Sequence, residues 1–104
     1  SRIIGFTAQS LWSAMEFGLD PQEAINVPHF QNNNDNTVLE APRPGFTVDY
    51  DVMAVANDLT MRGHDVNVIE QNARFPLNSG LAMIQIEGGK LTGGADFRRD
   101  GAVA

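Results

Sequence analysis

The chain of 104 residues contains no cysteine, which excludes disulfide bonds, cysteine metal sites and a thiol nucleophile. No apolar stretch approaches the ~20 residues that span a bilayer, and no signal peptide is visible. Basic residues are scarce, with 7 Lys and Arg against 13 Asp and Glu, so the net charge of −6 disfavours nucleic acid or an anionic membrane as a partner. The remaining composition, 42% hydrophobic and 19% charged, is typical of one globular domain or part of one.

Apolar residues recur at helical spacing in two long segments. Residues 3–19 are predicted to form a helix that buries the stripe Ile4, Ala8, Leu11, Trp12, Met15 and Leu19. Residues 48–62 are predicted to form another, with a buried face of Val52, Val55, Ala56 and Leu59. Asp49 and Asp51 suit the positive end of its dipole. Asp20 is expected to cap a short helix that starts at Pro21 and ends at Pro28.

Strands are predicted at residues 37–40, 65–70, 81–87 and 90–92, where apolar and β-branched residues gather. Residues 31–36 are expected to form a polar loop and residues 41–45 a rigid turn. Gly63 is expected to end the second long helix, and Gly88-Gly89 to turn a hairpin. The order of elements predicts an α/β fold with an antiparallel component and no internal domain boundary.

The residues alone show no recognisable catalytic arrangement. There is no Gly-x-Ser-x-Gly elbow, no P-loop and no metal-ligand spacing around the two histidines, so neither a metal nor a cofactor is expected. Ser10 and Ser13 fall inside a predicted helix, a poor place for a nucleophile. The amine of Ser1 would serve as base for its own hydroxyl only if Ser1 were a natural N-terminus.

The other polar candidates favour structural roles. His29 stands in a Val-Pro-His-Phe segment typical of a packed corner, and His64 follows the expected helix stop, where a partial positive charge is favourable. The glycine pairs at 88–89 and 93–94 precede no helix, which argues against a phosphate cradle. A solvated surface position is expected for each of the carboxylates considered, which are Asp49, Asp51, Asp58 and Asp65.

Four segments, taken in order, resemble the γ-glutamyltransferase (glutathione hydrolase) family. They are Ser1-Arg2-Ile3-Ile4, residues 17–30, the stretch from Glu40 to the run Arg62-Gly63-His64-Asp65-Val66, and residues 79–84 with the closing run Gly93-Gly94-Ala95-Asp96-Phe97-Arg98-Arg99-Asp100-Gly101. The closing run is the most specific, and together the segments cover nearly the whole chain. Two departures stand out, because His29 replaces a usual Arg and Phe97 a common Pro.

The resemblance implies part of an N-terminal-nucleophile (Ntn) hydrolase αββα sandwich, largely antiparallel sheet covered by two long helices. Such enzymes cut their own precursor, and the new N-terminal Thr attacks a γ-glutamyl amide. In the family that Thr, and the two glycines of the oxyanion hole, precede the segment that Ser1 to Ile3 match. No catalytic residue is therefore expected in this chain. Ser1, Arg2 and Ile3 are expected to lie beside the oxyanion loop and to anchor it to the first helix.

We therefore expect residues 1–104 to be one C-terminal segment of a γ-glutamyltransferase small subunit, cut from a longer chain and inactive alone. Its expected partners are the rest of that enzyme and, in the complete enzyme, the γ-glutamyl substrate. A homodimer through exposed apolar faces is a further expectation. The alternatives are a docking domain of an inactive homologue and part of a related β-lactam acylase. The family favours the periplasm or the cell exterior, with the cytoplasm as an alternative.

Overall fold

The computed structural model describes residues 3–32, 34–45, 48–70 and 79–99. Its elements are, in chain order, α1 (Ile3–Glu16), α2 (Pro21–Asn26), β1 (Phe30–Asn32), β2 (Thr37–Glu40), α3 (Val52–Met61), β3 (Val66–Ile69), β4 (Ala82–Glu87) and β5 (Lys90–Ala95). The mixed α/β class predicted from the sequence is confirmed. No helix among the described residues is both long enough and apolar enough to cross a bilayer.

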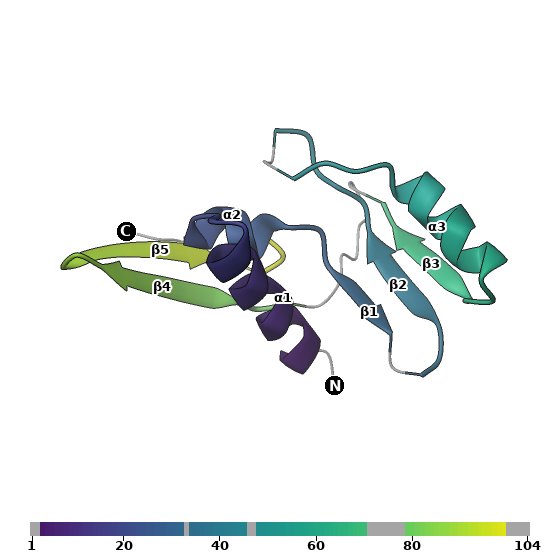
Figure 1. The fold of residues 1–104 in the computed structure, drawn as a ribbon, viewed down its shortest axis with the longest axis horizontal. Coiled ribbons are helices and arrows are strands. Elements are labelled where there is room, and N and C mark those ends of the chain that lie inside the picture. The colour runs from purple at the N-terminus through teal and green to yellow at the C-terminus, as the bar shows by residue number, and fades with distance from the viewer. Residues whose placement is uncertain (1–2, 33, 46–47, 71–78, 100–104) are drawn as a thin grey trace.

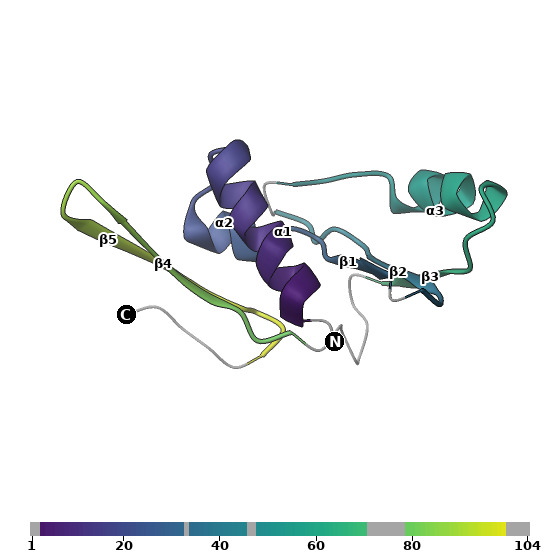
Figure 2. The ribbon, with the colours of Figure 1, turned by 60° about the horizontal axis from the view of Figure 1, so that its bottom comes forward.

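The elements divide into two parts that lie side by side along the long axis of the molecule (Figure 1). The sheet part holds β1, β2 and β3 in that order, with α3 against one face. The hairpin part holds the β4–β5 ribbon with α2 against it and α1 against α2 (Figure 2). The molecule measures 48 × 28 × 27 Å, and its radius of gyration of 14.3 Å exceeds the ~13 Å of a compact domain of this length. The described fold is therefore elongated.

Local signals fix the ends of several elements as predicted. The Asp20 carboxylate accepts a hydrogen bond from the Glu23 amide at 2.8 Å and caps α2, whose first residue is Pro21. Gly63 follows α3 with φ of 95°, a conformation that favours glycine. Gly88 and Gly89, with φ of 58° and 77°, form the two-residue turn between β4 and β5.

The predicted bounds differ from the structure in several places. The first helix stops at Glu16, before Gly18 turns the chain with φ of 66°. The helix α3 starts at Val52, because the Asp51 carboxylate caps the Ala54 amide at 3.1 Å, which leaves Asp49 outside the first turn. A short strand, β1, occupies the start of the predicted polar loop, and β5 runs three residues further than expected, to Ala95.

The strand pairing is largely antiparallel, as predicted, with one exception. The pairs β1–β2 and β4–β5 are antiparallel, whereas β2 and β3 are parallel, with Thr37 opposite Val66 and Glu40 opposite Ile69. The parallel pair follows from α3, which connects the two strands as a crossover and packs back on them. On α3 itself, the predicted face is confirmed in part: Ala56 is buried and Val52 and Leu59 are partly buried, but Val55 is exposed.

The predicted buried face of α1 is wrong. Ile4, Trp12 and Met15 are 82%, 61% and 79% exposed, and Leu11 is exposed as well. The helix instead turns Phe6, Ser10 and Ser13 toward the protein. A helix is expected to bury its apolar stripe, so this orientation leaves an apolar surface uncovered.

The apolar core is small and lies where the two parts meet. Phe6 of α1 and Val38 of β2 are buried together, with Ile69 and Leu81 packed against them. The hairpin part is held separately by α2, whose Ala24 and Ile25 are fully buried. At Gly94 of β5 the backbones approach so closely that an added Cβ would lie 2.6 Å from the Pro21 carbonyl carbon.

Candidate functional site

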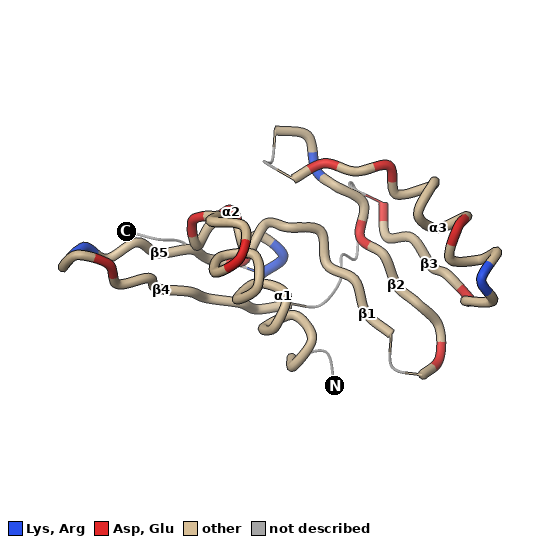
Figure 3. The backbone as a smooth tube through the Cα atoms, in the orientation of Figure 1, with Lys and Arg blue, Asp and Glu red and all other residues tan. Residues whose placement is uncertain are grey.

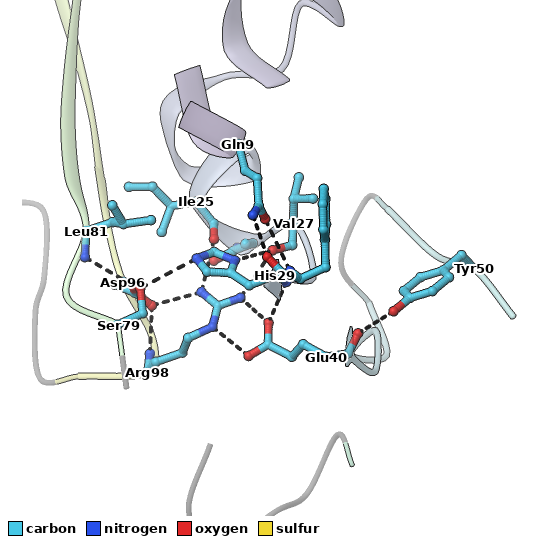
Figure 4. Close-up of polar contacts among 12 residues, drawn as sticks. Gln9, Ile25, Val27, His29, Glu40, Tyr50, Ser79, Leu81, Asp96 and Arg98 are labelled. Atoms are coloured by element: carbon cyan, nitrogen blue, oxygen red, sulfur yellow. Dashed lines mark hydrogen bonds and ion pairs between the residues drawn. The ribbon is translucent and has the colours of Figure 1, made fainter. Parts of the chain in front are cut away.

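A buried polar cluster lies between the two parts of the fold (Figure 4). Its members are His29, Glu40, Ser79, Asp96 and Arg98, here called the joint cluster. They come from the ends of elements: His29 precedes β1, Glu40 ends β2, Ser79 precedes β4, and Asp96 and Arg98 follow β5. The side chains of residues distant in the sequence therefore meet at one point.

Arg98 is the centre of the joint cluster, and its side chain is 0% exposed. Its Nε donates to Glu40 Oε2 at 2.8 Å, and its Nη2 donates to the other carboxylate oxygen of Glu40 and to the Val27 carbonyl at 3.2 Å. Its Nη1 donates to Asp96 Oδ1 at 3.0 Å and to the Ile25 carbonyl at 3.1 Å. A guanidinium has five N–H groups, so every donor has an acceptor, which is the condition under which a buried arginine is tolerated.

The carboxylate of Asp96 also has several hydrogen-bond donors. Besides Arg98 Nη1, its carboxylate accepts hydrogen bonds from the Ser79 hydroxyl, from the Leu81 amide at 3.1 Å and from the Arg98 amide at 3.0 Å. Burial acts to raise the pKa of Asp96, but the Ser79 hydroxyl, the two amides and the Arg98 charge outweigh it and lower that pKa. Asp96 is therefore an ionised structural acceptor and a poor general acid.

His29 borders the joint cluster and is 1% exposed. Its Nδ1 lies 2.9 Å from the Val27 carbonyl oxygen, which can only accept, so the proton belongs on Nδ1. Its Nε2 then faces the Ser79 oxygen at 3.5 Å. Burial, followed by the charge of Arg98, lowers the pKa of His29, and so the ring is neutral at physiological pH.

Ser79, His29 and Asp96 have the residue types of a catalytic triad, but their order is different. In a triad the carboxylate orients the histidine and the histidine accepts the serine proton. Here the Ser79 hydroxyl donates its hydrogen bond to the carboxylate of Asp96, and the Nδ1–H of His29 donates to the main-chain carbonyl of Val27. Ser79 is also buried. The joint cluster is thus built for holding the fold together and not for nucleophilic attack.

Apart from His29 and Ser79, the candidate residues considered in the sequence analysis lie outside the joint cluster. Ser1 and Arg2 are outside the described residues, and Ile3 is the exposed first residue of α1. His29 occupies the packed corner that was predicted. His64 is exposed, with its Nδ1 3.5 Å from Thr37 Oγ1. The carboxylates expected at the surface are all exposed, namely Asp49, Asp51, Asp58 and Asp65.

Sequence reasoning missed Glu40, Asp96 and Arg98 as partners. The available signal was a charged residue within an otherwise apolar or glycine-rich segment, as Glu40 is after Val38 and Leu39. Such a residue needs a partner of opposite charge if it is buried. Among the described residues there is no group of three or more His, Cys, Asp or Glu that would hold a metal ion. Basic residues stand at separate places along the fold (Figure 3).

Two apolar hollows open on the surface. One, of about 460 Å³, lies along α1 and is lined by residues that include Trp12, Phe17 and Phe30. The other, of about 500 Å³, lies between β1–β2 and α3 and is lined by residues that include Leu39, Tyr50 and Leu59. Val27 and Phe30 line both hollows, so the two form one broken apolar surface.

The family model described as gamma-glutamyltranspeptidase matches residues 1–104, the whole chain. The chain belongs to the γ-glutamyltranspeptidase family. No curated protein sequence matches this γ-glutamyltranspeptidase-family chain.

Solved structures share its fold. An acivicin-inhibited γ-glutamyltranspeptidase, whose own C-terminus has critical roles in autoprocessing and catalysis, is 19% identical over 95% of this chain and 49% of its own, with a TM-score of 0.72. The enzyme of Pseudomonas nitroreducens, complexed with L-DON, is 16% identical over 97% of this chain and 48% of its own, with a TM-score of 0.69.

A cephalosporin acylase from Bacillus halodurans is 28% identical over 95% of this chain and 17% of its own, with a TM-score of 0.67. This chain of 104 residues thus spans about half the length of the γ-glutamyltranspeptidase chains that it matches, and a smaller share of the acylase chain. These likenesses confirm the predicted Ntn-hydrolase fold class.

Proposed function

We propose that this chain is the C-terminal scaffold of an enzyme that cleaves γ-glutamyl amide bonds and transfers the acyl group to water or an amino acid. Glutathione and related compounds would be the donors. Residues 1–104 would form one segment of the small subunit, and the Thr nucleophile would lie in the polypeptide before Ser1. Family membership supports this proposal, as does a match to only about half of each γ-glutamyltranspeptidase chain.

The observation that carries the proposal is the uncovered apolar face of α1. Ile4, Leu11, Trp12 and Met15 point away from the described protein, and the hollow of about 460 Å³ continues this face to Phe30. An apolar patch of this kind marks a contact surface. Because related chains are about twice as long, the other half of the enzyme is the occupant that we propose for it.

The described side chains also support a scaffolding role. The buried hydroxyl of Ser79 is hydrogen-bonded to Asp96, and the Nδ1 of the exposed His64 is 3.5 Å from the buried hydroxyl of Thr37. Neither hydroxyl combines an accessible position with a well-placed base, which a nucleophile requires. We therefore expect the chain alone to be inert.

A related β-lactam acylase is the second candidate. The cephalosporin acylase is 28% identical to this chain, against 19% and 16% for the two γ-glutamyltranspeptidases described above. Both kinds of enzyme cleave an amide by acyl transfer, so the scaffold alone does not separate them, and substrate assays of the complete protein must do so.

The test compares the 104-residue chain with the complete polypeptide that its gene encodes. We expect the complete polypeptide to cut itself into two subunits, the smaller starting at Thr, and to release p-nitroaniline from a γ-glutamyl anilide. The chain alone should release none above the blank. Trp12→Asp in the complete polypeptide should reduce self-cleavage, because a carboxylate would be buried in the proposed contact without a partner.

Each other outcome has a defined meaning. Release by the chain alone would refute the scaffold role. Self-cleavage with activity only on a cephalosporin side chain would favour the acylase. A complete polypeptide that neither cuts itself nor hydrolyses either substrate would favour the docking domain of an inactive homologue. Unchanged self-cleavage of Trp12→Asp would show that the apolar face of α1 is covered by something else, such as a second copy.

A further inference from the structure

Few contacts join the two parts of the fold. Among the described helices and strands, only α1 and β1 bring their backbones close together across the boundary between the hairpin part and the sheet part. Gln9 of α1 pairs there with both main-chain groups of Phe30, at 2.6 and 3.2 Å. The rest of the boundary consists of the small apolar core around Phe6 and of the joint cluster. The stability of this boundary therefore depends strongly on a few buried side chains.

His29 lies at the point where the apolar core and the joint cluster meet. Its ring centroid is 4.4 Å from that of Phe6 on α1, and its main-chain amide donates to Glu40 Oε1 at 3.1 Å. Its main-chain carbonyl accepts from the Glu40 amide at 2.9 Å. The charged groups that face it are Arg98 and Asp96 after β5 and Glu40 at the end of β2. Phe6, its ring contact on α1, carries no charge.

We propose that His29 is an acid-sensitive switch for this boundary: the neutral ring holds the two parts together, and protonation of Nε2 loosens them. The geometry gives a new proton no good acceptor. The Nδ1 proton is already directed to the Val27 carbonyl, and the Ser79 oxygen lies 3.5 Å from Nε2. That distance is too long for a strong hydrogen bond.

The charges around the ring act in opposite directions. Glu40 and Asp96 attract a second cation, but their oxygens are already occupied by Arg98 and by main-chain amides. Arg98 repels it, and a buried position disfavours any added charge. Burial and Arg98 prevail, and the pKa of His29 is lowered from the ordinary 6.5. The contribution of the neutral His29 ring to stability is thus fully present above pH 6.5. It is lost as the pH falls from 6.5 toward the lower pKa of the folded state.

Hydrogen exchange of two main-chain amides tests the switch. The amide of Phe30 donates to Gln9 across the boundary, and the amide of His29 donates to Glu40 inside the joint cluster, so their protection factors report closure of the boundary. Between pH ~7.5 and ~5 we expect these factors, corrected for intrinsic exchange, to fall severalfold. The amides paired between β4 and β5 should change less.

Two variants separate His29 from general acid effects. The chain has two histidines, and the other, His64, is exposed. His29→Gln, which has no titrating ring, should keep its protection constant over this pH range. His64→Gln should lose protection as the wild-type chain does. Equal loss of protection in His29→Gln and wild type would overturn the proposal.

A third measurement applies if His29→Gln does not fold. In His64→Gln, the remaining imidazole signal in the NMR spectrum belongs to His29 alone. We expect it to report a neutral ring below pH 6.5, the ordinary value, while the amide protection falls, because the opened state takes up the proton before the folded state does. A ring that becomes protonated while the amides stay protected would refute the switch. These outcomes are independent of any enzymatic activity, and hence of the proposed function.

Discussion

The outer face of α1 and the joint cluster reverse the usual distribution of side chains in opposite ways. On α1, residues such as Trp12 and Met15 are exposed while Ser10 and Ser13 are buried. In the joint cluster, a guanidinium and two carboxylates are buried beside the small apolar core. The first region exposes apolar side chains to water, whereas the charges of the second are paired within the chain.

The contrast shows what each kind of reversal requires. An exposed apolar surface has a cost in water that only another molecule or segment removes, at about 25 cal/mol per Å² of area covered. A buried charge has a cost that hydrogen bonds within the same chain offset, provided that they are all made, as they are for Arg98. Burial alone therefore identifies neither a core nor a functional site.

The largest expected effect is the loss of Arg98. Arg98→Met leaves the carboxylates of Glu40 and Asp96 buried without their cation, and we expect it to lower the free energy of unfolding by about 5 kcal/mol. The matched control is Arg62→Met, because Arg62 pairs with Asp58 at 3.2 Å on the surface with 69% of its side chain exposed. There we expect less than about 1 kcal/mol.

Urea unfolding followed by circular dichroism measures both variants. If both variants lower the free energy of unfolding equally little, the joint cluster does not stabilise the fold, and the contrast drawn with α1 is wrong. If Arg98→Met is unfolded already in the absence of urea, the loss exceeds the stability of the chain, which agrees with the expected size of the effect.

The next effect compares two aromatic side chains on opposite faces of α1. Phe6→Ala removes a ring from the buried core and should lower the free energy of unfolding by about 3 kcal/mol. Trp12→Ala removes a larger ring from the exposed face and should change it by no more than about 0.5 kcal/mol in this chain. The same urea titration measures both. A large loss in Trp12→Ala would mean that the exposed face is already packed, against the proposed contact with the other half of the enzyme.

Much of the local structure was predictable from the sequence, because short-range signals determine it. Asp20, Gly63 and the Gly88-Gly89 turn each act on their immediate neighbours, and each was placed correctly. The strand β1 was missed because two of its three residues, Gln31 and Asn32, are polar, and its pairing with β2 comes from partners further along the chain. The burial of α1 was mispredicted because periodicity gives a helix an apolar face without saying what covers it.

The joint cluster was beyond prediction from spacing alone. Glu40 and Arg98 are 58 positions apart and meet only after β2 and β5 have each been placed in their own part of the fold. The family resemblance indicated that the closing run of residues was significant, but gave no partner for Arg98. Pairing a buried charge requires the tertiary structure, whereas capping and turns do not.

The smallest expected effect compares two buried serines, one on α1 and one in the joint cluster. The Ser79 hydroxyl donates to the Asp96 carboxylate, whereas the Ser10 hydroxyl on α1 has no hydrogen-bond partner within the described part of the chain. Ser79→Ala should lower the free energy of unfolding by about 2 kcal/mol, the range for a hydrogen bond to a charged group. It should also raise the pKa of Asp96, so that stability is lost at a higher pH during acid titration.

Ser10→Ala should leave the free energy of unfolding unchanged or raise it by about 1 kcal/mol, because it removes a buried hydroxyl that gains nothing in this chain. Urea unfolding at neutral pH, and at a pH near the ordinary value for aspartate, measures both serine variants. A loss in Ser10→Ala equal to that in Ser79→Ala would mean that Ser10 has a partner, and that the inner face of α1 is as complete as the joint cluster. If Ser79→Ala lowers the free energy of unfolding and Ser10→Ala raises it, the buried serine without a hydrogen-bond partner is the one on α1.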